Sequence, residues 1–261
     1  MVEETVLQLL AKRLIDADDG RQPIAPLSDE IKMSMHEAYA IQRLVSKERM
    51  GRGDEVVGHK IGLTSKAMQS MFNVMEPDFG PLWRSWQKPN GSTVSLIDFI
   101  APRLEVEVAL VLKYPLSGAS VTAMDVALAT EYLVGAYEIV DSRITDWKIT
   151  IFDTVADGAS GGCFVLGDLK RSPLDLEAGK ISMSLKKNGE IVSTGAARAV
   201  QGHPFESVAW LARALGRFGE EMIPGEVVLS GAMAAAVPLE GGCSYEADLL
   251  GLGTLKLEVV A

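Results

Sequence analysis

The segment Arg103–Leu112 constrains the fold more than any other part of this sequence, because it is almost wholly apolar yet contains two glutamates. In a strand, Glu105 and Glu107 point to one face, and that face continues through Ala109 and Val111. An amphipathic strand with two solvated glutamates is one interpretation, but the apolar continuation favours a face that is at least partly buried. Two buried carboxylates this close repel each other unless a cation neutralises them, and a divalent metal does so directly.

A third carboxylate, Glu138, lies in a second strand-like run of low polarity at residues 134–141. Three carboxylates without a convergent His or Cys favour a hard cation, Mg²⁺ or Mn²⁺, over Zn²⁺. The alternative role for Glu138 is an ion pair with Arg143 or Arg103. The sequence therefore suggests a metal site without excluding a purely structural use of Glu138.

Two further polar residues stand in glycine-containing segments. Lys60 lies between Gly58 and Gly62, and glycines in a strand allow a ligand or backbone to approach closely. Lys60 therefore suits charge neutralisation or proton transfer, although a surface lysine on an edge strand fits equally well. Asp78 follows a proline and precedes Gly80, which is the usual pattern of a turn aspartate.

Three other features carry weaker signals. Ser160 lies in the small-residue segment 156–162, which either offers backbone N–H groups to an anion or packs tightly. His203, before Pro204, has the pattern of a helix cap or core histidine, and Cys163 that of a small core residue. No motif for a covalent nucleophile or a phosphate-binding loop occurs in the sequence.

The composition and charge of the chain disfavour several classes of function. The 261 residues carry a formal net charge of −10, which disfavours nucleic-acid binding. No run approaches the roughly 18–20 apolar residues of a membrane helix, and the acidic start lacks the basic region of a secretory signal. Two cysteines exclude a disulfide framework and fit a reducing compartment. We therefore expect a cytoplasmic protein that binds neither nucleic acid nor membranes.

The pattern of elements predicts a helical N-terminal lobe, residues 1–55, followed by a β-rich catalytic domain, residues 56–261. Helices are expected at 5–19 and from Ser34, with 21–33 irregular, and later at 122–133 and 204–217. Asn188–Gly189 is a strong hairpin signal. Strands and helices do not alternate regularly, which argues against Rossmann and TIM-barrel folds. The expected strands are 56–63, 104–112, 134–141, 181–187, 190–194, 226–230, 244–249 and 254–259.

Taken together, several segments resemble the hydratase/decarboxylase family of aromatic meta-cleavage pathways. Each segment alone is weak, but their order and spacing match over nearly the whole chain, and residues 141–149 are most similar to the pentadienoate hydratases. The segments are residues 58–64 (GHKIGLT), 77–80 (PDFG), 104–107 (LEVE), 138–143 (EIVDSR), 153–157 (DTVAD), 194–197 (TGAA) and 202–204 (GHP).

The resemblance implies an α+β fold like the C-terminal domain of fumarylacetoacetate hydrolase, a mixed β-sandwich or roll with flanking helices. It also implies a Mg²⁺ or Mn²⁺ site whose ligands match Glu105, Glu107 and Glu138. Lys60 matches the family's active-site lysine, and Asp78 matches an acidic residue near the substrate. We further expect two residues to contact the substrate, namely Ser160 and Arg143.

The activity implied is a metal-dependent lyase reaction, the hydration of a 2-hydroxy-2,4-dienoate (2-oxo-4-enoate) to a 4-hydroxy-2-oxo acid. One alternative is 4-oxalocrotonate decarboxylase, whose diacid substrate needs a distal cation such as Arg198 or Arg143. Another is a non-catalytic structural partner, favoured by Gly158, where the family usually has asparagine. The resemblance also implies an assembly of five or ten subunits, and association between a hydratase and a decarboxylase.

Overall fold

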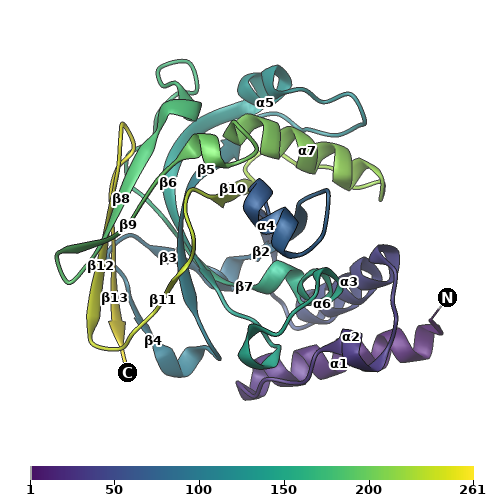
Figure 1. Cartoon of the computed structure of the whole chain (residues 1–261). Coiled ribbons are helices and arrows are strands. Elements are labelled where there is room, and N and C mark those ends of the chain that lie inside the picture. Colours follow the sequence, from purple (N-terminus) through teal and green to yellow (C-terminus); the bar gives the residue numbers. More distant parts are fainter. Residues whose placement is uncertain (1) are drawn as a thin grey trace.

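Two β-sheets pack face to face, and the larger one contains the segment Arg103–Leu112. The computed structural model describes residues 2–261 and shows the sheets side by side, with helices beside the larger one (Figure 1). The larger sheet has the order β2-β1-β10-β5-β6-β7-β3, with β11 paired to β5. Its strands are β1 Val56–Gly62, β2 Asp78–Trp83, β3 Gln87–Pro89, β5 Arg103–Leu112, β6 Thr130–Val140, β7 Gly161–Leu166, β10 Val227–Ala232 and β11 Val237–Pro238.

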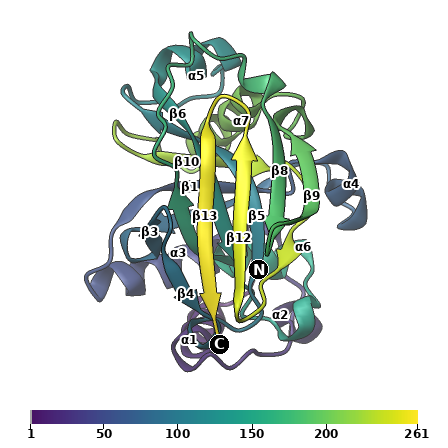
Figure 2. The same ribbon diagram turned by 90° about the vertical axis from the view of Figure 1, so that its left-hand side faces the viewer.

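The smaller sheet has the order β4-β13-β12-β8-β9 and forms one side of the molecule (Figure 2). Residues of both sheets share the main core, including Tyr137 of β6 and Tyr245 of β12. This arrangement confirms the expected mixed β-sandwich with flanking helices. The strands are β4 Thr93–Ser95, β8 Ser182–Lys187, β9 Glu190–Ala196, β12 Cys243–Leu249 and β13 Gly253–Val260.

The helices form two groups beside the larger sheet (Figure 1). One group contains α5 and α7, and the other contains the N-terminal helices with α6. Among the helices of residues 2–261, none combines the length and apolar character of a membrane span. The α-helices are α1 Glu4–Gly20, α2 Leu27–Glu30, α3 Met35–Gly51, α4 Lys66–Met71, α5 Ala123–Ala129, α6 Ile151–Ala156 and α7 Pro204–Gly216, and the 3₁₀ turns are Arg84–Trp86, Leu96–Asp98, Thr145–Trp147, Gly158–Ser160, Ala178–Lys180 and Ala197–Ala199.

Local sequence signals explain several boundaries. Ser34 caps α3 and exchanges side-chain and backbone hydrogen bonds with Glu37, as the capping-box pattern predicts. His203 caps α7 by accepting from the Phe205 N–H. The β8–β9 hairpin turns at Asn188 and Gly189, with φ values of 51° and 84°, which is the left-handed conformation that a tight hairpin requires.

The expectation of a helix over residues 122–133 is wrong at its C-terminal end. Helix α5 stops at Ala129, and β6 begins at Thr130. The following residues pair with β5, with Thr130 opposite Leu112. Sheet pairing and burial of branched and aromatic side chains therefore override helical periodicity here. Within the range expected to be irregular, residues 27–30 form the short helix α2.

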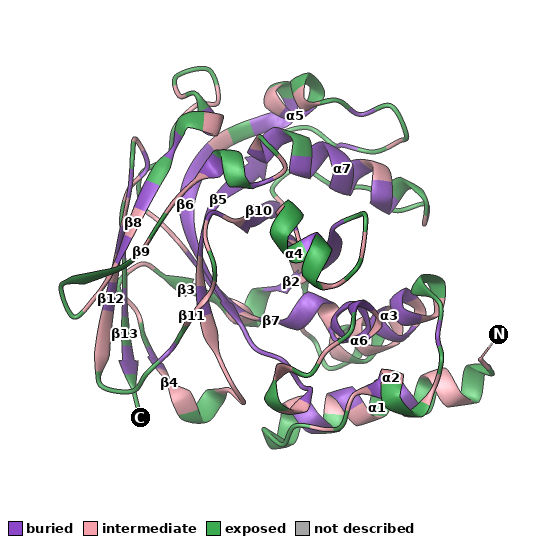
Figure 3. Cartoon of the chain, in the orientation of Figure 1, coloured by how far each residue is buried: buried purple, intermediate pink, exposed green. Residues whose placement is uncertain are grey.

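The two faces of β5 pack against different apolar clusters. Leu104, Val106 and Val108 are buried in the main core. On the opposite face, Ala109 and Val111 belong to a smaller apolar cluster with residues of β6, β7 and β10. Figure 3 shows β5 and β6 buried along most of their length. The face that carries the two glutamates is therefore at least partly buried, as its apolar continuation predicts, with Glu107 buried and Glu105 half-buried.

The N-terminal helices are joined to the larger sheet by buried polar contacts. Gln42 of α3 donates from Nε2 to the carbonyl oxygens of Phe79 (3.0 Å) and Val155 (2.8 Å). Ser28 of α2 donates from Oγ to Asp153 of α6 at 2.6 Å. These bonds fix β2 and α6, which supply site residues. The division of the chain into lobes at residues 55 and 56 stays a prediction.

Replacing Gln42 with Ala should lower the free energy of unfolding by about 1–3 kcal/mol, since two buried carbonyl groups lose a donor. The matched control is Gln8→Ala on the exposed face of α1. Urea unfolding followed by circular dichroism measures both variants. Equal stability of the two would contradict the role of Gln42 in joining the helices to β2 and α6.

Candidate metal centre and active site

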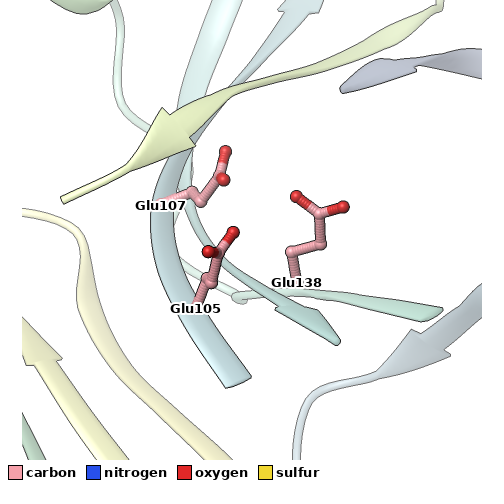
Figure 4. Close-up of side chains that lie close together, drawn as sticks. All are labelled: Glu105, Glu107 and Glu138. Carbon is pink, nitrogen blue, oxygen red and sulfur yellow. The ribbon is translucent and has the colours of Figure 1, made fainter. Parts of the chain in front are cut away.

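Three carboxylates converge on the buried face of the larger sheet. Glu105 and Glu107 are two residues apart on β5, and Glu138 lies directly opposite Glu105 on the antiparallel neighbour β6. One oxygen from each lies within 4.8 Å of the others, and the side chains point into the same space (Figure 4). Strand alternation and β5–β6 register therefore bring together the three residues that the sequence singled out.

Several oxygen atoms of this cluster have no protein partner. Glu107 accepts from the Gly231 N–H through Oε2 at 2.7 Å. Within residues 2–261, its Oε1 atom and the Oε2 atom of Glu138 are buried without a hydrogen bond. Buried polar atoms are rarely left unpaired. A set of free, buried carboxylate oxygens fits a hard divalent cation such as Mg²⁺ or Mn²⁺.

The protonation behaviour of the cluster reflects its crowding. Burial, followed by the charge of Glu138, raises the pKa of Glu105 from 4.5 to about 7. Burial and the same neighbour raise the pKa of Glu107 well above its ordinary value. The pKa of Glu138 is also raised by burial, although Lys60 opposes the shift. Without a cation, the folded protein therefore favours protons on these carboxyls.

Lys60 lies beside the cluster on β1, and only 3% of it is exposed. Its Nζ lies 3.2 Å from Glu138 Oε1 and donates to the carbonyl oxygen of Ala159 at 2.9 Å. Burial lowers the pKa of Lys60, but Glu138 and Asp78 outweigh it, so the net shift is upward. Lys60 is therefore buried and not a surface lysine, and the neighbouring carboxylates favour its charged form.

Asp78 is the first residue of β2 and lies opposite Gly62 of β1. Its Oδ2 accepts from Thr154 Oγ1 at 3.2 Å, and its Oδ1 is buried without a partner. A Cβ on Gly62 would lie 2.2 Å from Asp78 Oδ1 and 3.6 Å from Lys60 Nζ, so glycine is needed there. Burial raises the pKa of Asp78, and Lys60 opposes this shift.

The other two expected site residues, Arg143 and Ser160, lie in a separate buried network around Asp157. The Arg143 guanidinium is paired with the Asp157 carboxylate and also donates to the carbonyl oxygens of Asp157 and Gly161. Ser160 donates to Asp157 Oδ2 at 3.2 Å. The structure thus brings together the three glutamates, Lys60 and Asp78, whereas Arg143 and Ser160 contact Asp157.

Sequence reasoning assigned no role to three groups around the site. These are Asp157, the Thr154 hydroxyl and the Ala159 carbonyl oxygen. Thr154 and Asp157 lie in segment 153–157, one of those that carry the family resemblance. Membership of that segment could have indicated that these two residues lie near the site. A backbone carbonyl has no signature in the sequence, so the contact between Ala159 and Lys60 could not be found that way.

A cavity of about 780 Å³ lies beside this cluster. Thr64 lines it and lies close to Gly231, whose N–H donates to Glu107. Buried donors on its wall, Gln201 Nε2 and Trp210 Nε1, have no partner within residues 2–261. The size falls in the usual range of small-molecule sites.

Several known proteins are similar to this chain over nearly its full length. The family model for the fumarylacetoacetate hydrolase C-terminal domain matches residues 75–260. A 2-hydroxyhexa-2,4-dienoate hydratase from Comamonas testosteroni is 43% identical over 99% of both chains. A 2-keto-4-pentenoate hydratase from Paraburkholderia xenovorans is 41% identical over 95% of this chain and 93% of its own.

A solved structure has the same fold over its full length. The 4-oxalocrotonate decarboxylase from Pseudomonas putida G7, complexed with magnesium and adipate, is 31% identical and superposes with a TM-score of 0.98. That match covers 100% of this chain and 99% of the other. The same decarboxylase complexed with calcium and acetate gives a TM-score of 0.96. The chain therefore belongs to the fumarylacetoacetate hydrolase family and, within it, to the hydratase/decarboxylase family of meta-cleavage pathways.

Proposed function

We propose that this protein is a metal-dependent hydratase that adds water to a 2-hydroxy-2,4-dienoate, giving a 4-hydroxy-2-oxo acid in aromatic catabolism. The observation that carries the proposal is the convergence of three carboxylates, two buried and one half-buried, beside the buried side chains of Lys60 and Asp78. Near-full-length relatives are named hydratases of such dienoates, which supports the same reaction.

Glu105, Glu107 and Glu138 are the proposed ligands of a divalent metal, Mg²⁺ or Mn²⁺. Buried oxygens of Glu107 and Glu138 without hydrogen bonds, and the magnesium in the related decarboxylase, support this assignment. When bound, such an ion supplies Lewis-acid stabilisation of negative charge on the C2 oxygen of the substrate. The acidic chain thereby gains local positive charge for an anionic ligand.

Lys60 and Asp78 are the proposed catalytic residues. The upward pKa shift keeps Lys60 charged, which suits it to hold the anionic substrate and orient it. Asp78 Oδ1 is free of hydrogen bonds, and its carboxyl has a raised pKa, both of which suit proton transfer. Protonation of the dienol at its far carbon, with loss of the proton from the C2 hydroxyl, gives an unsaturated ketone. The water oxygen then bonds to C4, and we propose that Asp78 takes one proton from this water and returns it to C3, which completes the 4-hydroxy-2-oxo acid.

The cavity beside the cluster is the proposed place for the rest of the substrate. Arg198 lines this cavity, is exposed and forms no ion pair within residues 2–261. It is therefore available for the distal carboxylate of a diacid, which keeps decarboxylation of 4-oxalocrotonate as a second candidate. Arg143 is unsuited to that contact because its donors face Asp157 and Gly161.

Product analysis separates the candidates. Metal-stripped protein receives 2-hydroxypenta-2,4-dienoate or 2-oxohex-3-enedioate, each with and without Mg²⁺. Loss of the dienol with a gain in mass of one water, only with metal, is the expected result. Release of CO₂ from the diacid alone would support the decarboxylase instead. No reaction with either substrate would support a non-catalytic structural partner.

Assembly and location are further proposals that follow from the family resemblance. We propose a homo-oligomer of five or ten subunits, cytoplasmic action and association with a partner decarboxylase. Sedimentation velocity of the purified protein tests the subunit number. A monomer at micromolar concentration would contradict the proposed assembly.

Glu105→Gln should weaken metal binding by about 100-fold or more, since one anionic ligand is lost, and abolish metal-dependent turnover. The metal-free variant should be at least as stable as the parent, because repulsion within the cluster falls. Calorimetric titration with Mn²⁺, a turnover assay and thermal unfolding measure the three effects. The control is Glu131→Gln, an exposed residue of the same strand as Glu138. Full activity of Glu105→Gln would contradict the metal assignment.

The metal-free protein should become less stable as pH rises through the interval between 4.5 and about 7, the ordinary and folded pKa values of Glu105. The folded state holds a proton that the unfolded chain releases, so raising the pH favours unfolding. A bound cation takes the place of the proton, and stabilisation by Mg²⁺ should therefore grow with pH. Thermal unfolding with EDTA or Mg²⁺ measures both trends. A Mg²⁺ effect that does not depend on pH would contradict the account.

A further inference from the structure

We propose that Arg143 is a positioning residue that acts on Lys60 through the turn at residues 157–161. Its guanidinium closes this turn, and the turn directs the Ala159 carbonyl oxygen at the Lys60 ammonium. The inference rests on the proposed function, which assigns Lys60 to the active site. In this proposal Arg143 does not make the substrate contact that the sequence led us to expect, but affects the reaction by fixing the position of Lys60.

Arg143 forms hydrogen bonds with both ends of this turn. Its Nη2 donates to the Asp157 carbonyl oxygen at 2.6 Å, and its Nη1 donates to the Gly161 carbonyl oxygen at 2.7 Å. Its Nε is paired with the Asp157 carboxylate, which also accepts from the Arg143 backbone N–H at 3.1 Å. One planar group therefore joins both ends of the turn, and the fixed fork of arginine suits this geometry.

The turn itself has an unfavourable backbone conformation. Gly158, Ala159 and Ser160 have φ values of 68°, 54° and 52°, three consecutive residues in the left-handed region. Glycine adopts this region freely, but alanine and serine do so at a cost. Such a conformation persists only where the surroundings hold it. The bonds from Arg143 to both ends of the turn provide that restraint.

Close packing fixes the turn against the sheet. A Cβ on Gly80 of β2 would lie 2.1 Å from the Gly158 carbonyl oxygen, so the strand and the turn are in direct contact. The Ser160 carbonyl oxygen accepts from the Asp141 N–H at 2.8 Å. Ala159 is buried. A turn held this way presents its Ala159 carbonyl oxygen in one place.

That oxygen is a neutral partner for Lys60, whose other close partner is the carboxylate of Glu138. If the turn relaxed, the ammonium would lose its neutral acceptor and move toward the carboxylates. Lys60 would then be misplaced relative to the substrate and the metal ligands. Misplacement of a catalytic group by about 1 Å can reduce a rate by roughly 100-fold.

The test is the variant Arg143→Lys, which keeps the charge but cannot reach both ends of the turn. With Mg²⁺-loaded protein and 2-hydroxypenta-2,4-dienoate, kcat should fall by about tenfold or more, while KM changes by less than about threefold. The control Arg84→Lys alters an exposed ion pair with Glu55. Unchanged kcat, or a rise in KM alone, would overturn the proposal, the latter by indicating a direct substrate contact.

A double-mutant cycle separates positioning from a purely structural role. If Arg143 acts through Lys60, Arg143→Lys should reduce kcat little further in a Lys60→Ala background. Independent, multiplying effects would overturn the proposal. If Arg143→Lys fails to fold, Asp157→Asn removes the charge from the same ion pair with nearly the same shape. The same non-additivity with Lys60→Ala is expected from that variant.

A crystal structure of the variant gives an answer that does not depend on the reaction. Displacement of the Ala159 carbonyl oxygen from Lys60 in Arg143→Lys is the expected result, whatever the substrate. An unchanged turn and an unchanged Lys60 contact would overturn the positioning role. Absence of turnover by the parent protein would instead contradict the proposed function and leave this structural comparison valid.

Discussion

Repulsion among the carboxylates of Glu105, Glu107 and Glu138 is the constraint on which the rest of the site depends. All three are held on one face of the larger sheet, where one oxygen from each lies within 4.8 Å of the others. Charged groups in such surroundings need a counter-charge or protons. Lys60 supplies one positive charge beside Glu138. The oxygens without partners suit a further cation, and a divalent ion would offset two of the remaining negative charges.

The sheet makes this costly arrangement rigid. The pairing of β5 with β6 fixes Glu105 opposite Glu138, and a cluster of apolar side chains continues the same face away from the site. Gly62 lets Asp78 and Lys60 approach from the neighbouring strands. The turn at residues 157–161 supplies the Ala159 carbonyl oxygen, which accepts a hydrogen bond from Lys60. The polar groups of the candidate site therefore come from strands and from one restrained turn, which limits their movement.

The shared direction of Glu105 and Glu107 on β5 could be predicted because strand alternation is a local property that can be read from the chain. The capping box at Ser34 and the hairpin at Asn188 were likewise local signals, and the structure confirms both. The α+β fold and the family followed from the resemblance of several segments and are also confirmed. Roles inferred for individual side chains stay predictions.

Contacts between distant segments could not be predicted from local patterns. Gln42 joins α3 to β2 and α6, and Arg143 joins the two ends of a turn, through bonds to backbone carbonyls. Any polar side chain can form such bonds, so residue type alone does not identify the partner. The predicted boundary between α5 and β6 was wrong for a related reason. Thr130 pairs with Leu112 of β5, and the local sequence around Thr130 does not indicate that partner.

The most direct test of the central claim is anomalous diffraction from a crystal of the protein loaded with Mn²⁺. The account predicts one strong anomalous peak within bonding distance of Glu105, Glu107 and Glu138, with Lys60 still beside Ala159. The exposed control residue Glu131 should have no such peak near it. Absence of a peak among the three glutamates, or a peak only elsewhere on the chain, would contradict the claim that they form a metal site.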